Sequence, residues 1–177
     1  MVHKAILFAA CAHEGQKRKG SDIPYIVHPF EVAQILTSAG VGETVICAGL
    51  LHDTVEDTSV TLEDIQKEFG SDIAKMVGIV TEEKGLSWEE RKQQAIDAVN
   101  DGISKDVKML ICADKLSNLR SIKEDLKCMG DDVWSKFKRG KEKQKWYYGR
   151  MMEQLSSLHA YSIYQELCLL YHQIFSD

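Results

Sequence analysis

From residue 50 to residue 57 the chain reads Leu-Leu-His-Asp-Thr-Val-Glu-Asp. This stretch begins in apolar sequence and ends with four ionisable side chains, which are those of His52, Asp53, Glu56 and Asp57. Burying that many ionisable groups beside a hydrophobic run is costly unless a cation binds them. The stretch therefore indicates a divalent metal site at the end of a buried helix.

The sequence around this stretch predicts an all-α fold. Residues 43–54 are apolar on almost all sides, which is typical of a helix at the centre of a fold. Apolar residues also recur at helical spacing in three further long segments and in a helix that starts near Pro29. The three segments are 2–14, 104–125 and 141–175. No segment alternates with the period of a strand, so we expect one all-α domain over residues 1–177.

Shorter helices are predicted from their start signals. Thr61 with Asp64 and Ser87 with Glu90 have the spacing of capping boxes, which open helices over 62–69 and 88–101. Ser71 is expected to cap a helix over 72–81.

The composition is that of an ordinary globular chain, with 44% hydrophobic and 28% charged residues among 177. No apolar run reaches the roughly 20 residues that cross a bilayer, and the N-terminus lacks the layout of a secretory signal. The five cysteines are scattered and form no CxxC pair. These features predict a cytoplasmic protein with reduced thiols and no membrane partner.

The charge is unevenly distributed. The net charge of −5 argues against a nucleic-acid partner. Ten of the 22 basic residues nevertheless lie in two short segments, 17–19 and 136–150, and the second segment contains one acid, Glu142. Two local basic patches on an acidic protein suit a small, highly anionic ligand.

Two other places in the sequence offer metal ligands. Asp114 interrupts an apolar helical pattern and is followed by Asn118, and His28 stands at a helix entrance before Pro29. With His52 and Asp53 they make two imidazoles and two carboxylates, a set that suits Mn²⁺, Fe²⁺, Co²⁺ or Zn²⁺.

Each of these residues also has an ordinary structural explanation. A His-Asp pair is more often a surface pair or a cap than a ligand pair, and His28 by itself is explained as a cap of its helix. Asp114 by itself is explained as a buried ion-pair acid, with Lys115 or Arg120 as its partner. The occurrence of three such exceptions, each within apolar helical sequence, favours the metal site.

Four segments together resemble a known family. They are Arg-Lys-Gly at 18–20, Pro-Tyr-Ile-Val-His-Pro at 24–29, Leu-Leu-His-Asp-Thr-Val-Glu-Asp-Thr at 50–58 and Ala-Asp-Lys-Leu-Ser-Asn-Leu-Arg at 113–120. The order His, His-Asp, Asp resembles the HD metal-dependent phosphohydrolases. The Glu-Asp pair after His-Asp is similar to the hydrolase half of the Rel/Spo proteins and to the stand-alone small alarmone hydrolases. The resemblance covers the chain from about residue 2 to about residue 160.

This resemblance implies an HD-domain helical bundle, a reaction and a set of roles. The metal ligands would be His28, His52, Asp53 and Asp114, around one ion that is usually Mn²⁺ in the family. Glu56 and Asp57 would activate the attacking water and manage the leaving-group proton. The reaction would remove the 3′-pyrophosphate of guanosine tetraphosphate (ppGpp) or pentaphosphate (pppGpp), giving GDP or GTP. The synthetase and regulatory domains of the long family members are expected to be absent.

The resemblance also implies substrate contacts. Arg18 and Lys19 would contact the guanine and phosphate region, and Asn118 would bind the ribose or the 3′ side. From the second basic segment we select Lys141 and Lys145 as phosphate contacts, although a solvated basic face explains them equally well.

Other functions stay open from the sequence. The same site could serve another nucleotide with a 2′- or 3′-phosphate, such as NADPH, or belong to a non-catalytic nucleotide sensor. The apolar stripe over 141–175 leaves room for a homodimer, but core packing explains it equally well.

Overall fold

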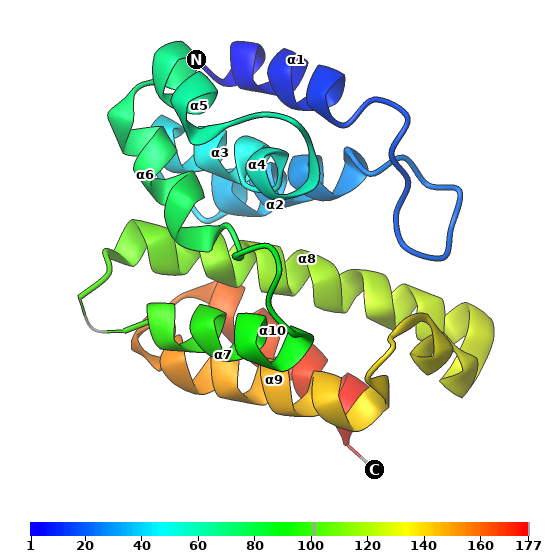
Figure 1. Ribbon diagram of the computed structural model, residues 1–177. Coiled ribbons are helices and arrows are strands. Elements are labelled where there is room, and N and C mark those ends of the chain that lie inside the picture. The colour runs from blue at the N-terminus through cyan, green and yellow to red at the C-terminus, as the bar shows by residue number, and fades with distance from the viewer. Residues whose placement is uncertain (101, 177) are drawn as a thin grey trace.

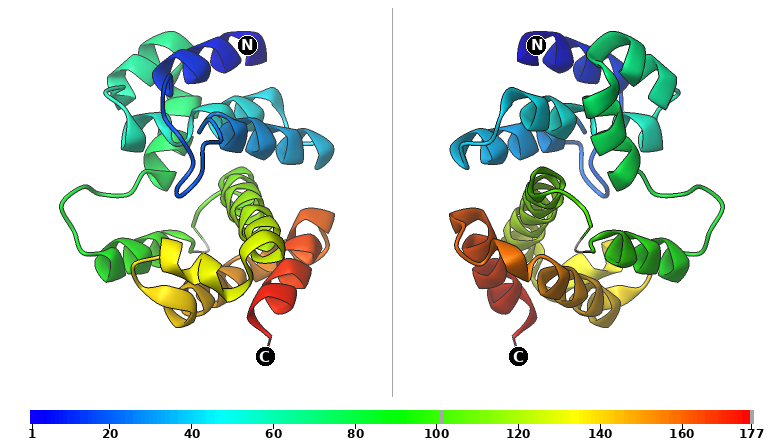
Figure 2. Two further views of the ribbon diagram at one scale, coloured as in Figure 1. Left: turned by 90° about the vertical axis from the view of Figure 1, so that its right-hand side faces the viewer. Right: turned by 90° about the vertical axis from the view of Figure 1, so that its left-hand side faces the viewer.

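The long helix α8 (Lys105–Met129) crosses the middle of the molecule and separates two groups of helices, α1 to α6 on one side and α7, α9 and α10 on the other (Figures 1 and 2). The structure is a computed structural model that describes residues 1–100 and 102–176. The other helices are α1 (Val2–Ala12), α2 (Val27–Ser38), α3 (Glu43–Leu51), α4 (Thr54–Asp57), α5 (Leu62–Phe69), α6 (Ser71–Val80), α7 (Trp88–Ala98), α9 (Gly140–Gln154) and α10 (Ser162–Phe175), with 3-10 turns η1 (Gly130–Lys136) and η2 (Ser156–Leu158).

The central position of α8 follows from its sequence. Ser104 caps the helix by accepting a hydrogen bond from the backbone of Val107, and the chain leaves the helix at Gly130, whose φ of 58° favours glycine. Between them, apolar side chains recur on two faces, so that α8 packs against α2 on one side and α10 on the other. Neither α8 nor any other helix in the described part of the chain is both long and apolar enough to cross a membrane.

The prediction of an all-α fold is confirmed. Within residues 1–100 and 102–176 the only strand-like pairing is an isolated bridge between Lys17 and Pro24. Helix α5 has the predicted bounds, and both capping boxes form. The helix predicted over 72–81 starts one residue earlier, with Gly70 rather than Ser71 at its N-cap. The helix predicted over 88–101 ends at Ala98 as α7, and residue 101 lies outside the described residues.

The single helix predicted over 141–175 is wrong. The chain turns back after Gln154 through η2, so that α9 and α10 are separate helices. Leu155 and Leu158 are almost fully buried within this turn, which continues the apolar spacing through the reversal. The apolar stripe lies largely in the chain's own core, where Ile163, Leu167 and Ile174 are also buried. Core packing therefore accounts for the stripe.

Two glycines provide a test of the packing around α3. A Cβ atom on Gly49 of α3 would lie 2.6 Å from Cδ1 of Leu36, whereas one on Gly78 of α6 would lie at an ordinary 3.4 Å from Leu62. We expect Gly49→Ala to destabilise the protein by about 1–3 kcal/mol through overpacking. Gly78→Ala should stabilise it by about 0.5–1 kcal/mol, because alanine loses less backbone entropy in a helix. Urea denaturation of both variants measures the difference, and shifts of the same sign would contradict the packing described for α3.

Candidate metal centre and adjoining cavities

Four of the predicted residues meet between α2, α3 and α8. Nε2 of His28 lies 3.5 Å from Oδ2 of Asp53 and 3.2 Å from Oδ1 of Asp114. Nε2 of His52 lies 3.1 Å and 3.8 Å from the same two oxygens. Ligand atoms of His28, His52 and Asp114 all lie within 4.8 Å of one another, which is close enough to hold one metal ion.

The end of α3 allows His52 and Asp53 to face the same point. Adjacent side chains on a continuous helix diverge by about 100°. The helix predicted over 43–54 instead ends at Leu51, and Asp53 has φ −93° and ψ −6° as the N-cap of the short helix α4. The buried hydroxyl of Thr54 donates to the carbonyl of Leu51 and stabilises this break.

His52 has the features of a metal ligand. Its Nδ1 lies 2.8 Å from the carbonyl oxygen of Gly49, which can only accept, so Nδ1 carries the proton. Nε2 is then the nitrogen left for a cation: it is buried, faces two carboxylates and has no hydrogen-bond partner within residues 1–100 and 102–176. Burial opposes a charge on His52, yet Asp53 and then Asp114 raise its pKa to about 9. The position favours a cation, and a divalent metal fits the two nitrogen and two oxygen donors.

The two candidate carboxylate ligands are held ionised. Burial opposes their charge, but His52 keeps the pKa of Asp53 below its usual range, and Lys115 keeps the pKa of Asp114 well below its own. Nζ of Lys115 lies 2.6 Å from Oδ2 of Asp114. Lys115 is thus the ion-pair partner of Asp114.

Glu56 and Asp57 lie on α4, directly after the ligand pair. Oε2 of Glu56 accepts a hydrogen bond of 3.1 Å from the backbone N–H of Glu82, whose carboxylate pairs with Arg91. The side chain of Gln16 holds the backbone carbonyl of Asp57 at 2.8 Å. Burial, followed by neighbouring carboxylates, raises the pKa of both Glu56 and Asp57. A raised carboxyl pKa suits general acid–base catalysis near neutral pH.

Arg18 and Asn118 connect to the metal centre through hydrogen bonds. The guanidinium of Arg18 donates to Oδ1 of Asn118 at 3.0 Å, and Nδ2 of Asn118 donates to Asp114 at 2.7 Å. The hydroxyl of Tyr25 donates to Oδ2 of Asp53 at 2.6 Å, and its ring lies under the Arg18 guanidinium. The loop predicted to contact substrate is therefore tied to two of the candidate ligands.

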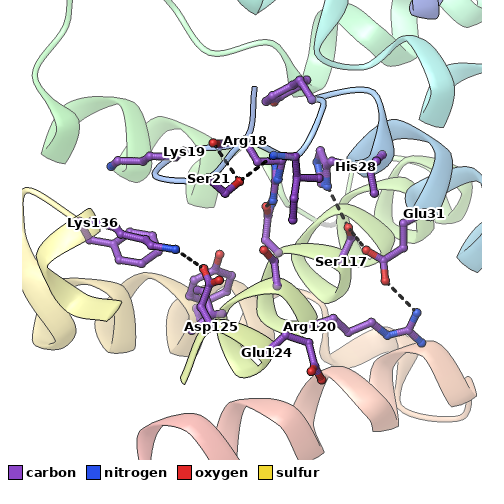
Figure 3. A pocket seen from close by; sticks show the side chains of 18 residues that line it. Arg18, Lys19, Ser21, His28, Glu31, Ser117, Arg120, Glu124, Asp125 and Lys136 are labelled. Carbon is purple, nitrogen blue, oxygen red and sulfur yellow. Dashed lines mark hydrogen bonds and ion pairs between the residues drawn. The ribbon is translucent and has the colours of Figure 1, made fainter. Parts of the chain in front are cut away.

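Two cavities reach residues of the candidate metal centre. Cavity A, of about 440 Å³, reaches His28 and Asn118 and is drawn in Figure 3. Its lining also includes Arg18, Lys19, Lys136 and Tyr148. Cavity B, of about 350 Å³, reaches Asp114, and its lining includes Glu82, Arg91, Lys115 and Tyr147. Tyr147 and Tyr148 are consecutive on α9, so this helix contributes a tyrosine to each cavity.

Lys141 and Lys145 lie apart from these cavities. Nζ of Lys141 is 6.0 Å from the ring centre of Trp134, and the backbone carbonyl of Lys145 accepts from the hydroxyl of Tyr171 on α10. Neither lysine is among the described residues that line cavity A or cavity B. From the same basic segment it is Lys136 that lines cavity A, where its ammonium pairs with Asp125 (Figure 3).

Several residues at the site carry no signal in the sequence. Glu82, Arg91 and Lys92 sit near a capping box and look like ordinary surface charges, but they pair with one another beside Glu56. Tyr147 looks like part of a core stripe, yet its buried hydroxyl has no hydrogen-bond partner in the described part of the chain. A signal existed for Ser117, which lies between Asp114 and Asn118 in a segment already singled out.

The class of protein follows from a match to a known family of helical domains. A family profile described as HD domain matches residues 5–142, and the chain belongs to the HD-domain family. The resemblance to the Rel/Spo hydrolase half and the small alarmone hydrolases is confirmed by curated relatives.

Curated relatives of the chain differ in the share of their own length that the match covers. Guanosine-3′,5′-bis(diphosphate) 3′-pyrophosphohydrolase MESH1 of Mus musculus is 44% identical over 65% of this chain and 65% of its own length. The protein of the same name from Xenopus tropicalis is 42% identical over 76% of this chain and 74% of its own. GTP pyrophosphokinase rsh of Brucella melitensis is 40% identical over 69% of this chain, which is 17% of its own length.

Two solved structures share the fold. A crystal structure of a Listeria monocytogenes protein has a TM-score of 0.79 and 44% identity, and the alignment covers 85% of this chain and 99% of that one. The structure of a protein described as a metazoan ortholog of SpoT that hydrolyzes ppGpp has a TM-score of 0.82 and 29% identity. Its alignment covers 97% of this chain and 94% of that one.

Proposed function

We propose that the protein is a metal-dependent 3′-pyrophosphohydrolase of guanosine 3′,5′-bis(diphosphate), converting ppGpp or pppGpp to GDP or GTP and pyrophosphate. The observation that carries the proposal is the placement of Glu56 and Asp57 directly after a candidate metal site, where two histidines face two carboxylates. It is supported by the names of the mouse and Xenopus relatives and by the ppGpp hydrolysis ascribed to the metazoan ortholog of SpoT.

The proposed metal is one Mn²⁺ ion held by His28, His52, Asp53 and Asp114, with Fe²⁺, Co²⁺ and Zn²⁺ as alternatives of the same donor preference. When bound, such an ion lowers the pKa of a coordinated water and draws charge from a phosphoryl oxygen. The break after α3 and the hydroxyl of Tyr25 orient Asp53, and Lys115 with Asn118 orients Asp114.

Glu56 and Asp57 perform the proton transfers in this proposal. One carboxylate takes a proton from the attacking water, and the other, protonated, gives a proton to the leaving 3′-oxygen. Their raised pKa values allow one of the two to hold a proton at a pH at which exposed carboxyls are ionised. The backbone N–H of Glu82 holds the Glu56 carboxylate in position.

Each of the two cavities holds a different part of the substrate in this proposal. The nucleoside occupies cavity A, where Arg18 and Lys19 meet the base and phosphates and Asn118 meets the ribose. The 3′-phosphates cross the metal centre toward cavity B, where Arg91 and Lys115 supply positive charge. The predicted contacts of Lys141 and Lys145 with the substrate phosphates stay predictions. Only a substrate that extends beyond both cavities would reach these two lysines.

The discriminating experiment is a product assay. The purified protein with Mn²⁺ is offered ppGpp, pppGpp, NADPH and related 2′- or 3′-phosphorylated nucleotides, and the products are separated by ion exchange. We expect pyrophosphate and GDP from ppGpp. Inorganic phosphate from NADPH, without pyrophosphate from ppGpp, would support the alternative substrate. Binding of ppGpp without any turnover, with metal confirmed bound, would support a nucleotide sensor.

Arg18→Ala is expected to raise KM for ppGpp by about 10–150-fold with little change in kcat, because a hydrogen bond to a charged group contributes about 1.5–3 kcal/mol and its removal weakens binding uniformly. Steady-state kinetics measure this split. Lys17→Ala is the matched control, since the exposed ammonium of Lys17 pairs with Asp22 outside cavity A. Equal effects of the two variants would mean that the guanine base of ppGpp does not bind beside Arg18.

The proposal includes a cytoplasmic location and a small-molecule partner. The five cysteines are free, and Cys47 and Cys112 are buried, as suits a reducing compartment. The net charge of −5 favours a nucleotide over a nucleic acid as partner. The homodimer suggested by the last apolar stripe loses that support, because the stripe packs in the chain's own core.

A further inference from the structure

A row of hydrogen-bonded side chains runs from His28 away from the metal centre (Figure 3). Nδ1 of His28 lies 2.8 Å from Oγ of Ser117 on α8, and this hydroxyl lies 2.8 Å from Oε2 of Glu31 on α2. Arg120 of α8 reaches the other oxygen of Glu31 at 3.3 Å and also pairs with Glu166 of α10 at 2.7 Å. The row therefore links three helices to one candidate ligand.

The chemistry of the row fixes the direction of each hydrogen bond. The carboxylate of Glu31, paired with Arg120, offers only acceptors, so the hydroxyl hydrogen of Ser117 points to Glu31. The oxygen of Ser117 must then accept from Nδ1–H of His28. The remaining ring nitrogen, Nε2, is left as a lone pair that faces Asp53 and Asp114, which is the tautomer that binds a metal in this position.

The burial of these groups makes the arrangement specific. His28 is 3% exposed and Ser117 is 1% exposed, so the partner of Nδ1 in this structure is supplied by the protein and not by bulk solvent. Without the hydroxyl of Ser117, His28 loses the hydrogen-bond partner that the described residues give to Nδ1. The angle of the ring is then no longer fixed, and Nε2 is no longer held toward Asp53 and Asp114.

The two candidate histidine ligands are oriented by different devices. Nδ1 of His52 is held by a backbone carbonyl, that of Gly49, which no substitution of a side chain removes. Nδ1 of His28 depends on side chains alone. Outer-shell partners of a metal-binding histidine set its tautomer and raise its basicity, and a hydroxyl that is itself bound to a carboxylate is a strong partner of this kind.

We propose that Ser117 and Glu31 are positioning residues that hold His28 in its metal-binding tautomer, with Arg120 keeping Glu31 in place. The inference rests on the proposed function only in requiring a metal ion at His28, and it does not depend on the substrate. Neither Ser117 nor Glu31 touches the reacting atoms. Their effect on turnover would pass through the occupancy of the metal site.

The first test is a Mn²⁺ titration of the metal-free 177-residue chain by calorimetry. Ser117→Ala should weaken Mn²⁺ binding by about 10–100-fold, the usual effect of losing an outer-shell partner. Glu31→Gln keeps an acceptor for the hydroxyl but removes its charge, and should weaken binding less. Glu166→Gln is the matched control, since it makes the same chemical change on the far side of Arg120 and should leave the affinity unchanged.

The second test observes the Nδ1–H of His28 directly. In the protein loaded with Zn²⁺, a diamagnetic substitute for Mn²⁺, this proton should give a slowly exchanging ¹⁵N–¹H signal in the parent chain and should exchange faster with solvent in Ser117→Ala. A purely structural role for Ser117 would lower the melting temperature without changing this exchange. If Ser117→Ala does not fold, Glu31→Gln carries both measurements, because Glu31 lies on the partly exposed side of the row.

The outcomes separate this inference from the proposed function. The inference is overturned if Ser117→Ala binds Mn²⁺ as tightly as the parent chain, or if Glu166→Gln weakens binding as much as Glu31→Gln does. It stands, and the proposed function fails, if the parent chain binds Mn²⁺ in the expected manner but releases no pyrophosphate from ppGpp.

Discussion

Replacing Asp114 with asparagine should abolish Mn²⁺ binding and reduce turnover of ppGpp to background. The amide still accepts the hydrogen bond from Asn118 but removes the negative charge that faces both histidines. Loss of a ligand should weaken metal binding by more than the about 10–100-fold typical of outer-shell changes. The same change leaves the ammonium of Lys115, 15% exposed, without its carboxylate. Breaking a buried ion pair in this way should destabilise the protein by about 3 kcal/mol.

A double variant separates these two effects. Asp114→Asn with Lys115→Met removes both charges and should recover most of the stability, because replacing both members of a buried pair is often close to neutral. It should not recover metal binding or turnover. Urea denaturation and metal titration of the single and double variants provide the comparison. Turnover in the double variant would show that Asp114 serves the fold and not the metal.

Replacing Glu56 with glutamine or Asp57 with asparagine should lower kcat by about 10²–10⁴-fold, the usual contribution of general acid–base catalysis. Both changes preserve shape, and neither residue belongs to the proposed ligand set, so the affinities for Mn²⁺ and ppGpp should be retained. Single-turnover kinetics with metal-loaded protein measure the chemical step. An unchanged rate in both variants would remove these residues from the mechanism.

The same two carboxyl groups should make the metal-free protein less stable at higher pH. Their pKa values are raised in the folded chain above the ordinary 4.5 and 3.8, so the folded chain keeps these protons after the unfolded chain has released them. Stability therefore falls as the pH rises from the ordinary values through the folded ones.

The amide variants lack this penalty. Metal-free Glu56→Gln and Asp57→Asn should melt at a higher temperature than the parent chain near pH 8, with a difference that shrinks toward about pH 4. Glu14→Gln, which removes an exposed carboxyl two residues after the end of α1, is the control for the loss of one negative charge. A difference that grows on acidification would mean that folding lowers the pKa of these carboxyls instead of raising it.

The sequence predicted much of this site because buried charges are expensive. His28, His52, Asp53 and Asp114 each interrupt apolar helical sequence, and the structure brings them to one point. The prediction was weaker for Lys141 and Lys145, since lysines on an exposed helix look alike in sequence. Within the described part of the second basic segment, Lys136 of η1 lines cavity A, and the lysines of α9 do not.

Two features that were not predicted from the sequence are a chain reversal and an ion pair between distant residues. The continuous apolar spacing over 141–175 concealed a chain reversal, because a buried turn with Leu155 and Leu158 repeats the helical pattern. Arg91 and Glu82 carry no pattern at all, and their position beside Glu56 follows from the packing of α7 and the loop before it.

The all-α class and the four candidate metal ligands could be predicted from the sequence, because local apolar periodicity and the cost of buried charge are properties of short segments. The role of the acid pair that follows them was predicted from the resemblance to a known family. Two further features could be seen only in the tertiary structure. Helix α3 ends at Leu51, so that His52 and Asp53 converge, and Ser117 and Glu31 form a hydrogen-bonded row with Nδ1 of His28. The physical reason is that ligand direction and histidine tautomer depend on hydrogen bonds between segments far apart in the chain. The stretch from residue 50 to residue 57 therefore indicates a metal site, and the contacts of α2 and α8 give that site its geometry.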